Sequence, residues 1–357
     1  MKILMLGNWS GMASQIGSGL RNYGHEVTIA AFQDSFKGAY DIDINLSKKI
    51  SGFHRIDSIL NLIKLAFSGA KFDVVHLQTP FILSTGLTPL YLPVLAKLLS
   101  LAKIKSLSLA GDDYYYWNTS NQFLAYGPWE DAISEDYGNK LPFCAKPLGK
   151  FVNDWVVERM DLLIPSCYEY IFGYKNNPKL TEHIPFAFNV SEVQPSYYDQ
   201  ASKNSISILY AESRPGFKGS KHILPALNAV KEKYGDDVAI RFVKKVPYLE
   251  YKNMLASADI IIDQAYSFGW GMNAVEAMAL GKVVLSGSEK EALAYQGIDS
   301  SPIINILPNA EDIYMKLCNL IDNPEKIVSI GIESRAFAEA FHGYEAVIPK
   351  IVKAWSI

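Results

Sequence analysis

The sequence predicts an α/β protein of two doubly wound domains, each a parallel sheet with helices on both faces. Short runs of β-branched and aliphatic residues alternate with helical patterns along the chain, which is typical of such sheets. The 357 residues, 49% of them hydrophobic, are enough to fill two cores. Pro185, Asn189 and Pro195 interrupt any regular element between two sets of runs, so the domain boundary is expected near residues 185 to 200.

The first set of runs defines an N-terminal domain over residues 1–190, with expected strands at 2–6, 27–31, 74–77, 104–109 and 162–165. The second set defines a C-terminal domain over residues 191–335, with expected strands at 207–210, 239–244, 260–263, 283–286 and 303–306. Residues 336–357 are expected to form a helix that packs back towards the N-terminal domain, after a break near His342. Two such domains leave a cleft between them, and open α/β sheets bind ligands at the carboxyl ends of their strands.

Composition narrows the choice of partners and compartment. With 34 basic and 37 acidic residues the net charge is −3, which gives no basic field for a nucleic-acid backbone, so no nucleic acid is expected as a partner. The apolar segment 81–104 contains two prolines and two lysines, so we expect a loop and a packed helix there rather than a membrane span. The three cysteines are too far apart for a disulfide framework or a zinc site and favour the cytoplasm: Cys144, Cys167 and Cys318.

The clearest motif covers residues 260–286: a buried strand, a glycine-bearing turn, a helix beginning near Met272 and Asn273, and another strand. Gly269 and Gly271 would let a phosphate approach the unpaired amides at the start of that helix. Glu276, one turn further on, suits the 2′- and 3′-hydroxyls of a ribose. The motif predicts a nucleotide diphosphate pocket; the simpler alternative is a tight turn with a solvated glutamate.

A second motif, residues 208–227, places Arg214 and Lys218 on a loop between a strand and a helix. Two cations facing a cleft can bind a diphosphate and neutralise the charge that grows on it as it departs. The alternative is a solvated basic loop beside Lys221.

The phrase VEAMALGKVVL after a glycine turn resembles the nucleotide-sugar motif of family 4 retaining glycosyltransferases of the GT-B fold, which has two Glu residues separated by seven positions. Glu276 matches the second Glu, Trp270 stands for the Phe of the pattern, and Phe268 replaces the first Glu. The family also has an Arg and a Lys-Gly pair at nearly the spacing of Arg214 and Lys218, so the resemblance implies a catalytic diphosphate clamp for these two. Because the first Glu would contact the donor sugar, Phe268 is expected to alter donor choice; the alternative is a packed aromatic.

The turn between the first strand and the first helix contains Gly7 and Gly11. Its spacing is not GxGxxG, and no acidic residue ends the second strand, which argues against NAD. The resemblance places this turn, with Gly11, beside the acceptor and the donor phosphates; a plain strand-to-helix turn is the alternative.

Three further residues follow N-terminal strands. His76 ends a strand that resembles the Asp-Val-Val-His strand of the family; a structural hydrogen-bonding role is the commoner one for such a histidine. Ala110 stands where many members have a His, followed by Asp112 and Asp113. These carboxylates are candidates for contacts to sugar hydroxyls or for assisting acceptor deprotonation, with helix capping as the alternative.

No residue cluster predicts a metal site. Asp41 and Asp43 have the spacing of a manganese motif, but any acidic loop produces it, and cations with a helix end replace the metal here. The segment 48–72 combines basic and apolar residues at helical spacing, which suits either a membrane-surface helix or, as the favoured alternative, a core-facing helix with a basic outer side.

Together these features and the family resemblance predict a metal-independent glycosyltransferase without a separate cofactor, and the resemblance implies retention at the anomeric carbon. The enzyme would move a sugar from a nucleotide diphosphate-sugar to a hydroxyl of a glycan or lipid-linked glycan, in the cytoplasm, with peripheral contact to the inner face of the membrane left open. The alternative is a non-catalytic nucleotide-sugar-binding subunit, which Phe268 and Ala110 favour and Arg214, Lys218 and Glu276 oppose.

Overall fold

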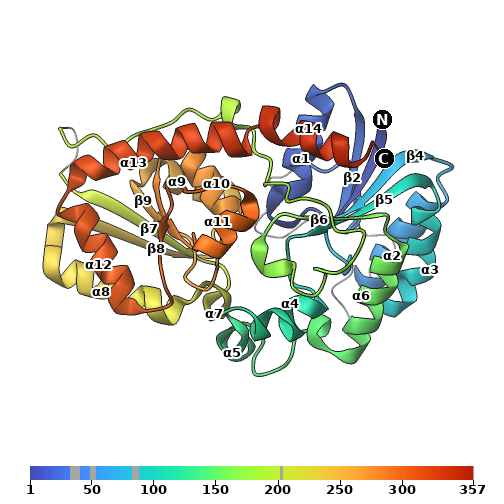
Figure 1. The fold of residues 1–357 in the computed structure, drawn as a ribbon, viewed down its shortest axis with the longest axis horizontal. Helices are drawn as coiled ribbons and strands as arrows, with labels where there is room; N and C mark the ends of the chain where they lie inside the picture. Colours follow the sequence, from blue (N-terminus) through green and yellow to red (C-terminus); the bar gives the residue numbers. More distant parts are fainter. Residues whose placement is uncertain (33–40, 49–53, 83–87, 202–203, 357) are drawn as a thin grey trace.

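The computed structural model describes residues 1–32, 41–48, 54–82, 88–201 and 204–356. It contains two parallel β-sheets, each flanked by helices, in two domains that lie side by side (Figure 1). The predicted class, two doubly wound α/β domains, is confirmed.

The N-terminal sheet has the strand order β3-β2-β1-β4-β5-β6, and all its pairs are parallel. Its strands are β1 Lys2–Leu6, β2 Glu26–Ala31, β3 Ile44–Asn45, β4 Phe72–Leu77, β5 Ala102–Leu109 and β6 Leu162–Pro165. Successive side chains of β1 face opposite sides of the sheet and all four from Ile3 to Leu6 are fully buried, which explains the unbroken apolar run. The helices of this domain are α1 Met12–Asn22, α2 His54–Ala66, α3 Thr88–Leu99, α4 Tyr114–Asn118, α5 Trp129–Asp131 and α6 Pro147–Arg159.

The C-terminal sheet has the order β11-β10-β9-β7-β8, again with parallel pairs. Its strands are β7 Ile206–Glu212, β8 Val238–Lys244, β9 Ile260–Ile262, β10 Val283–Ser286 and β11 Ile304–Asn305. Its helices are α7 Pro215–Lys218, α8 Ser220–Tyr234, α9 Tyr248–Ser257, α10 Met272–Ala279, α11 Lys290–Gln296, α12 Ala310–Ile321 and α13 Pro324–Phe337.

The chain crosses between the domains a second time after α13, through a π-helical turn at Ala338–His342, and ends in α14, Tyr344–Ala354. Figure 1 shows α13 over the C-terminal domain and α14 over the N-terminal one. Helix α14 packs against α1, where Gly19 permits the contact: a Cβ there would lie 2.5 Å from Ile348 Cδ1. The first crossing, between β6 and β7, contacts this second one. Phe188 N donates to His342 O (2.9 Å), and one ring nitrogen of His342 donates to Phe186 O (2.8 Å).

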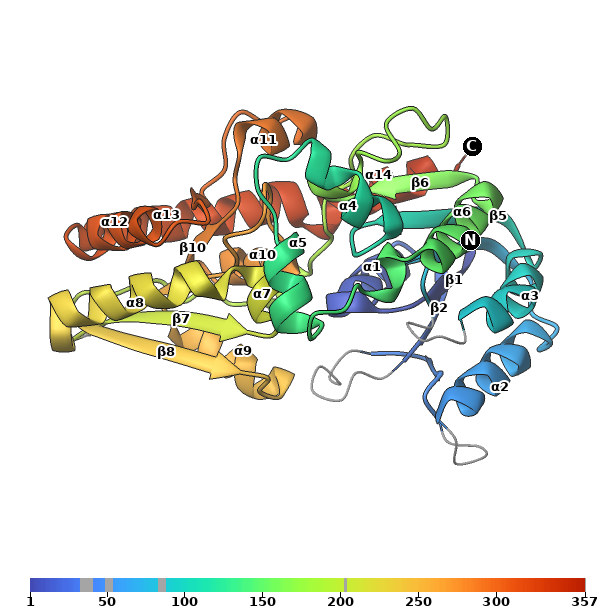
Figure 2. The same cartoon turned by 90° about the horizontal axis from the view of Figure 1, so that it is seen from below.

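A segment of the N-terminal domain around α4 and α5 reaches the C-terminal domain, and Figure 2 shows α5 beside α7. Phe217 N donates to Asp136 Oδ2 (2.7 Å), and Lys221 pairs with Asp131 (2.7 Å). Gly216 makes the close approach possible, since a Cβ would lie 2.3 Å from the carbonyl oxygen of Asp131. The domains are therefore held together on the side of α5 as well as at the crossings.

Helix α2 lies in the segment 48–72, of which residues 49–53 are outside the described part. Leu62 and Leu65 are buried in the core, while Ile56 and Phe67 are exposed. The core-facing arrangement thus accounts for part of the apolar pattern. In the described ranges, no helix combines the length and hydropathy needed to cross a bilayer.

Candidate functional site

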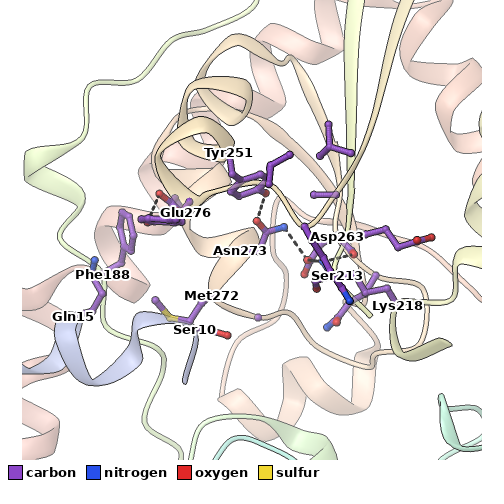
Figure 3. Close-up of a pocket in the computed structure, with 18 residues that line it drawn as sticks. Ser10, Gln15, Phe188, Ser213, Lys218, Tyr251, Asp263, Met272, Asn273 and Glu276 are labelled. Atoms are coloured by element: carbon purple, nitrogen blue, oxygen red, sulfur yellow. Dashed lines mark hydrogen bonds and ion pairs between the residues drawn. The ribbon is translucent and has the colours of Figure 1, made fainter. Parts of the chain in front are cut away.

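A cavity of about 240 Å³ lies at the carboxyl ends of β7, β8 and β9 (Figure 3). Parallel strands bring their carboxyl ends to one edge of the sheet, so residues distant in sequence converge there. Most of the wall belongs to the C-terminal domain, with Ser10 and Gln15 from the N-terminal domain and Phe188 from the first crossing completing it.

The strand-turn-helix motif forms one wall of this cavity. Strand β9 is buried, Gly271 caps the start of α10 in an extended conformation, and α10 buries its apolar residues against the sheet. Gly271, Met272, Asn273 and Glu276 of this motif line the cavity, whereas Gly269 does not. The first amides of a helix have no partner within it, so a helix start that lines a cavity favours an anion there.

Lys218, at the end of α7, also lines the cavity. Its ammonium donates to Asp263 Oδ1 (3.0 Å) and to the Asp263 carbonyl oxygen (3.1 Å). Asp263 Oδ1 further accepts from Asn273 Nδ2 (2.9 Å), and Asn273 Oδ1 accepts from the hydroxyl of Tyr251. These four side chains form one continuous polar network along the wall (Figure 3).

Glu276 is buried, and the hydroxyl of Tyr248 donates to both of its carboxylate oxygens, at 2.9 and 3.1 Å. Burial raises the pKa of Glu276, while the Tyr248 hydrogen bond and the charge of Lys252 act in the opposite direction. A carboxylate has about four lone-pair positions, so Glu276 keeps acceptor capacity for further hydroxyl groups.

The wall also contains residues that were not predicted, among them Lys245, Tyr248, Tyr251 and Asp263. Lys245 follows β8 with φ of 45°, an unusual conformation for a residue other than glycine, and its side chain is exposed. The signal that points to Lys245 and Asp263 is their position directly after β8 and β9, because ligand contacts in α/β sheets concentrate there; Tyr248 begins α9, the helix that follows β8.

Arg214, the other predicted cation, does not line the cavity. Its guanidinium donates to Asp112 Oδ2 (2.9 Å) and to the Tyr137 hydroxyl (2.9 Å), and it lies 3.9 Å from the centre of the Phe217 ring. Arg214 and Asp112 belong to different domains, so the pair bridges them. The structure therefore brings these two predicted residues together, but outside the cavity wall.

Phe268 and Gly269 also lie away from the wall. Phe268 is 7% exposed and stacks on Tyr126 of the N-terminal domain, with ring centres 4.6 Å apart. The backbone amides of Phe268 and Gly269 donate to Glu169 Oε1, at 2.7 and 2.9 Å, as does the hydroxyl of Ser267. These amides are occupied by a carboxylate of the same chain.

Asp113 is buried and caps α4, accepting from Tyr116 N (2.7 Å) and from the hydroxyl of Tyr174 (2.7 Å). Burial is the main reason that its pKa rises to about 7, and the two hydrogen bonds oppose the rise. The geometry is that of the capping alternative.

His76 is buried on β4, with its ring nitrogens 2.9 Å from the hydroxyl oxygens of Ser106 and of Ser108. Burial lowers its pKa to about 4, so the ring is neutral at pH 7. It lies beside a second, much smaller cavity of about 10 Å³ rather than at the main one.

Gly11 precedes α1 with φ of 75°, a left-handed conformation that favours glycine, and the neighbouring Ser10 lines the cavity. Asp43 pairs with Arg21 (2.6 Å) and accepts from Ile29 N (2.7 Å). Within the described part of the chain, no three His, Cys, Asp or Glu side chains gather where a metal ion could bind.

No model of a known protein family matches the sequence, and no curated protein matches it. Among solved structures, sucrose-phosphate synthase from Thermosynechococcus elongatus is similar over 99% of this chain and 98% of that one, with a TM-score of 0.65 and 16% identity. HepE from Anabaena, in complex with UDP and glucose, is similar over 100% of this chain and 99% of that one, with a TM-score of 0.59 and 15% identity. An alpha-glucosyltransferase in complex with UDP and a 13-mer DNA is likewise similar over 100% of this chain and 99% of that one, with a TM-score of 0.63 and 12% identity. At these identities the likeness concerns the fold alone, and the two parallel-sheet domains of this chain form the GT-B fold.

Proposed function

We propose that the protein is a nucleotide-sugar-dependent glycosyltransferase. The observation that carries the proposal is the convergence of Lys218, the start of α10 and Glu276 on one cavity at the carboxyl ends of the C-terminal strands. The cation and the helix amides suit a diphosphate, and the carboxylate suits ribose hydroxyls. HepE and the alpha-glucosyltransferase, which share the fold, were solved with UDP, so UDP is the first nucleotide to test.

The reaction would transfer the sugar with retention, as the resemblance to family 4 implies. The bond between the anomeric carbon and the diphosphate oxygen breaks, and a bond to the acceptor hydroxyl oxygen forms on the same face. The hydroxyl proton passes to the departing diphosphate. Lys218 and the amides of α10 stabilise the charge on that leaving group, and Arg214 joins them after leaving Asp112.

We further propose a glycan or lipid-linked glycan as acceptor, action without a metal ion, and a cytoplasmic location with peripheral contact to the membrane. The observation behind the last point is the exposure of Lys64, on α2, and of Phe67, directly after the helix. A vesicle-flotation assay with and without anionic lipid tests it.

The central test measures donor binding and turnover. Thermal unfolding is recorded with UDP, GDP and ADP, since a nucleotide at about 100 times its dissociation constant adds roughly 2.7 kcal/mol to the free energy of unfolding. Release of the nucleoside diphosphate from matching sugar donors is then measured, and the anomeric configuration of the transferred sugar is read by NMR. If none of the three nucleotides raises the free energy of unfolding, the proposed function is refuted.

A second candidate, a nucleotide-sugar-binding subunit without turnover, is favoured by the position of Arg214, which is held by Asp112 outside the cavity. Binding without any donor hydrolysis would select this candidate over the enzyme.

A further inference from the structure

Asp263 is an unexpected residue for a phosphate pocket. It follows β9 directly, its side chain is only 4% exposed, and it lines the same cavity as Lys218. A carboxylate beside a bound diphosphate repels it unless a positive charge compensates the carboxylate.

The compensation is present in the structure. Lys218 Nζ makes two contacts to Asp263, one with the carboxylate and one with the carbonyl oxygen, and its side chain is 14% exposed. An ammonium has three N–H groups, so one remains for a ligand in the cavity. Lys218 is also fixed through its backbone, because Ala265 N donates to its carbonyl oxygen (2.9 Å).

Asp263 holds the start of α10 as well. Asn273 donates to the same carboxylate oxygen that Lys218 contacts, and accepts from Tyr251 through its other amide atom. The amide of Asn273 is thereby fixed in one orientation. The second carboxylate oxygen of Asp263 lies 3.5 Å from the buried hydroxyl of Ser286. Asp263 thus connects the end of α7 with the first turn of α10.

Resting on the proposed function, we propose that Asp263 is a positioning residue of the donor pocket. It makes no contact with the donor. It holds the ammonium of Lys218 and the first turn of α10 in place before the nucleotide binds, so that both meet the diphosphate without rearrangement. Asp263 favours diphosphate binding only when Lys218 is present, since without that cation its carboxylate would repel the diphosphate.

Because of this dependence, we expect Asp263→Asn to change UDP affinity in opposite directions with and without Lys218. In the wild-type background, Asp263→Asn should weaken UDP binding about 10-fold or more, because Lys218 loses its charged partner. In the Lys218→Ala background, the same substitution should strengthen UDP binding about 3-fold or more, because it removes an uncompensated negative charge. Binding of uridine, which has no phosphate, should stay unchanged in all variants.

The measurement is isothermal titration of wild type, the two single variants and the double variant with UDP and with uridine. If the wild-type protein binds GDP or ADP instead, that nucleotide and its nucleoside replace UDP and uridine in the titrations. Asp259→Asn is the matched control, because Asp259 precedes the same strand and accepts from Ser207 N (2.9 Å) away from the cavity wall; it should leave UDP binding unchanged.

An equal loss of UDP affinity in both backgrounds, or a parallel loss for uridine, would overturn the inference and indicate a structural role. If Asp263→Asn does not fold, Asp263→Glu displaces the carboxylate by one methylene and should also weaken UDP but not uridine; unchanged UDP affinity in it overturns the inference. Wild-type protein that binds none of the three nucleotides removes the proposed function together with the inference, so the two failures are distinguishable.

Discussion

Replacing Phe268 by Glu separates the role implied by the family resemblance from the role that the contacts support. The resemblance implies that Glu at this position reaches the donor sugar, so Phe268→Glu would change donor choice and leave stability intact. In the structure Phe268 packs between the domains, 7% exposed, with Tyr126 at 4.6 Å and Tyr168 at 6.1 Å between ring centres. The contacts therefore predict a stability defect.

The magnitude follows from burial and charge. Truncating a buried Phe to Ala costs about 3 to 5 kcal/mol. Phe268→Glu loses the same contacts and also places a second carboxylate near Glu169, whose Oε1 already accepts from the Phe268 and Gly269 amides. We therefore expect the free energy of unfolding at pH 7.5 to fall by at least about 3 kcal/mol.

The assay is urea unfolding of wild type, Phe268→Glu and Phe268→Leu. Phe268→Leu is the control: it keeps an apolar side chain and loses chiefly the aromatic stacking, about 0.5 to 1.5 kcal/mol. Wild-type stability in Phe268→Glu, together with a changed ranking of sugar donors, would refute the packing argument and restore the donor-reading role.

Three other outcomes are expected. Glu276→Ala should weaken UDP binding by about 1.5 to 3 kcal/mol, and 2′-deoxy-UDP should lose less affinity in the variant than in wild type; equal losses would place the ribose elsewhere. Donor hydrolysis should persist in EDTA, and its abolition with recovery in manganese would contradict the metal-independent proposal. Stability should fall as the pH drops from 7.5 to 5, because burial lowers the pKa of His76 to about 4 and of His342 to about 3, so the unfolded chain binds more protons. Each histidine costs about 2 kcal/mol at pH 5, and Asp113, with its raised pKa, opposes them more weakly than the two together. Greater stability at pH 5 than at pH 7.5, measured by urea unfolding, would contradict this sum.

The fold was predictable because local patterns decide it. Strands β1, β6 and β10 have the predicted bounds, since each is an apolar run buried on both faces. The two-residue strand β3 was missed, because Ile44–Asn45 is too short to show a pattern and is defined by its pairing with β2.

The site was predictable only in part, because local sequence patterns place some of its residues and long-range contacts place the others. Gly271 and Glu276 lie on one strand-turn-helix unit, so sequence spacing alone places them together. The partners of Arg214, Phe268 and Asp113 are Asp112, Tyr126 and Tyr174, which are 61 to 142 residues away in the sequence, and the first two pairs join the two domains. Contacts across a domain interface depend on the tertiary arrangement, which no local pattern encodes.

Helix α14 has a consequence for how the protein is made. Ile3 and Met5 of the first strand are buried in one cluster with Val347, Ile351 and Trp355, so part of this apolar side of the N-terminal sheet stays uncovered until residues 344–355 leave the ribosome. The segment from β7 to α13, by contrast, contains its own sheet and core. Domains usually complete in the order of synthesis. Here the N-terminal domain is translated before the C-terminal one, but its apolar face is covered only after the C-terminal domain has been made.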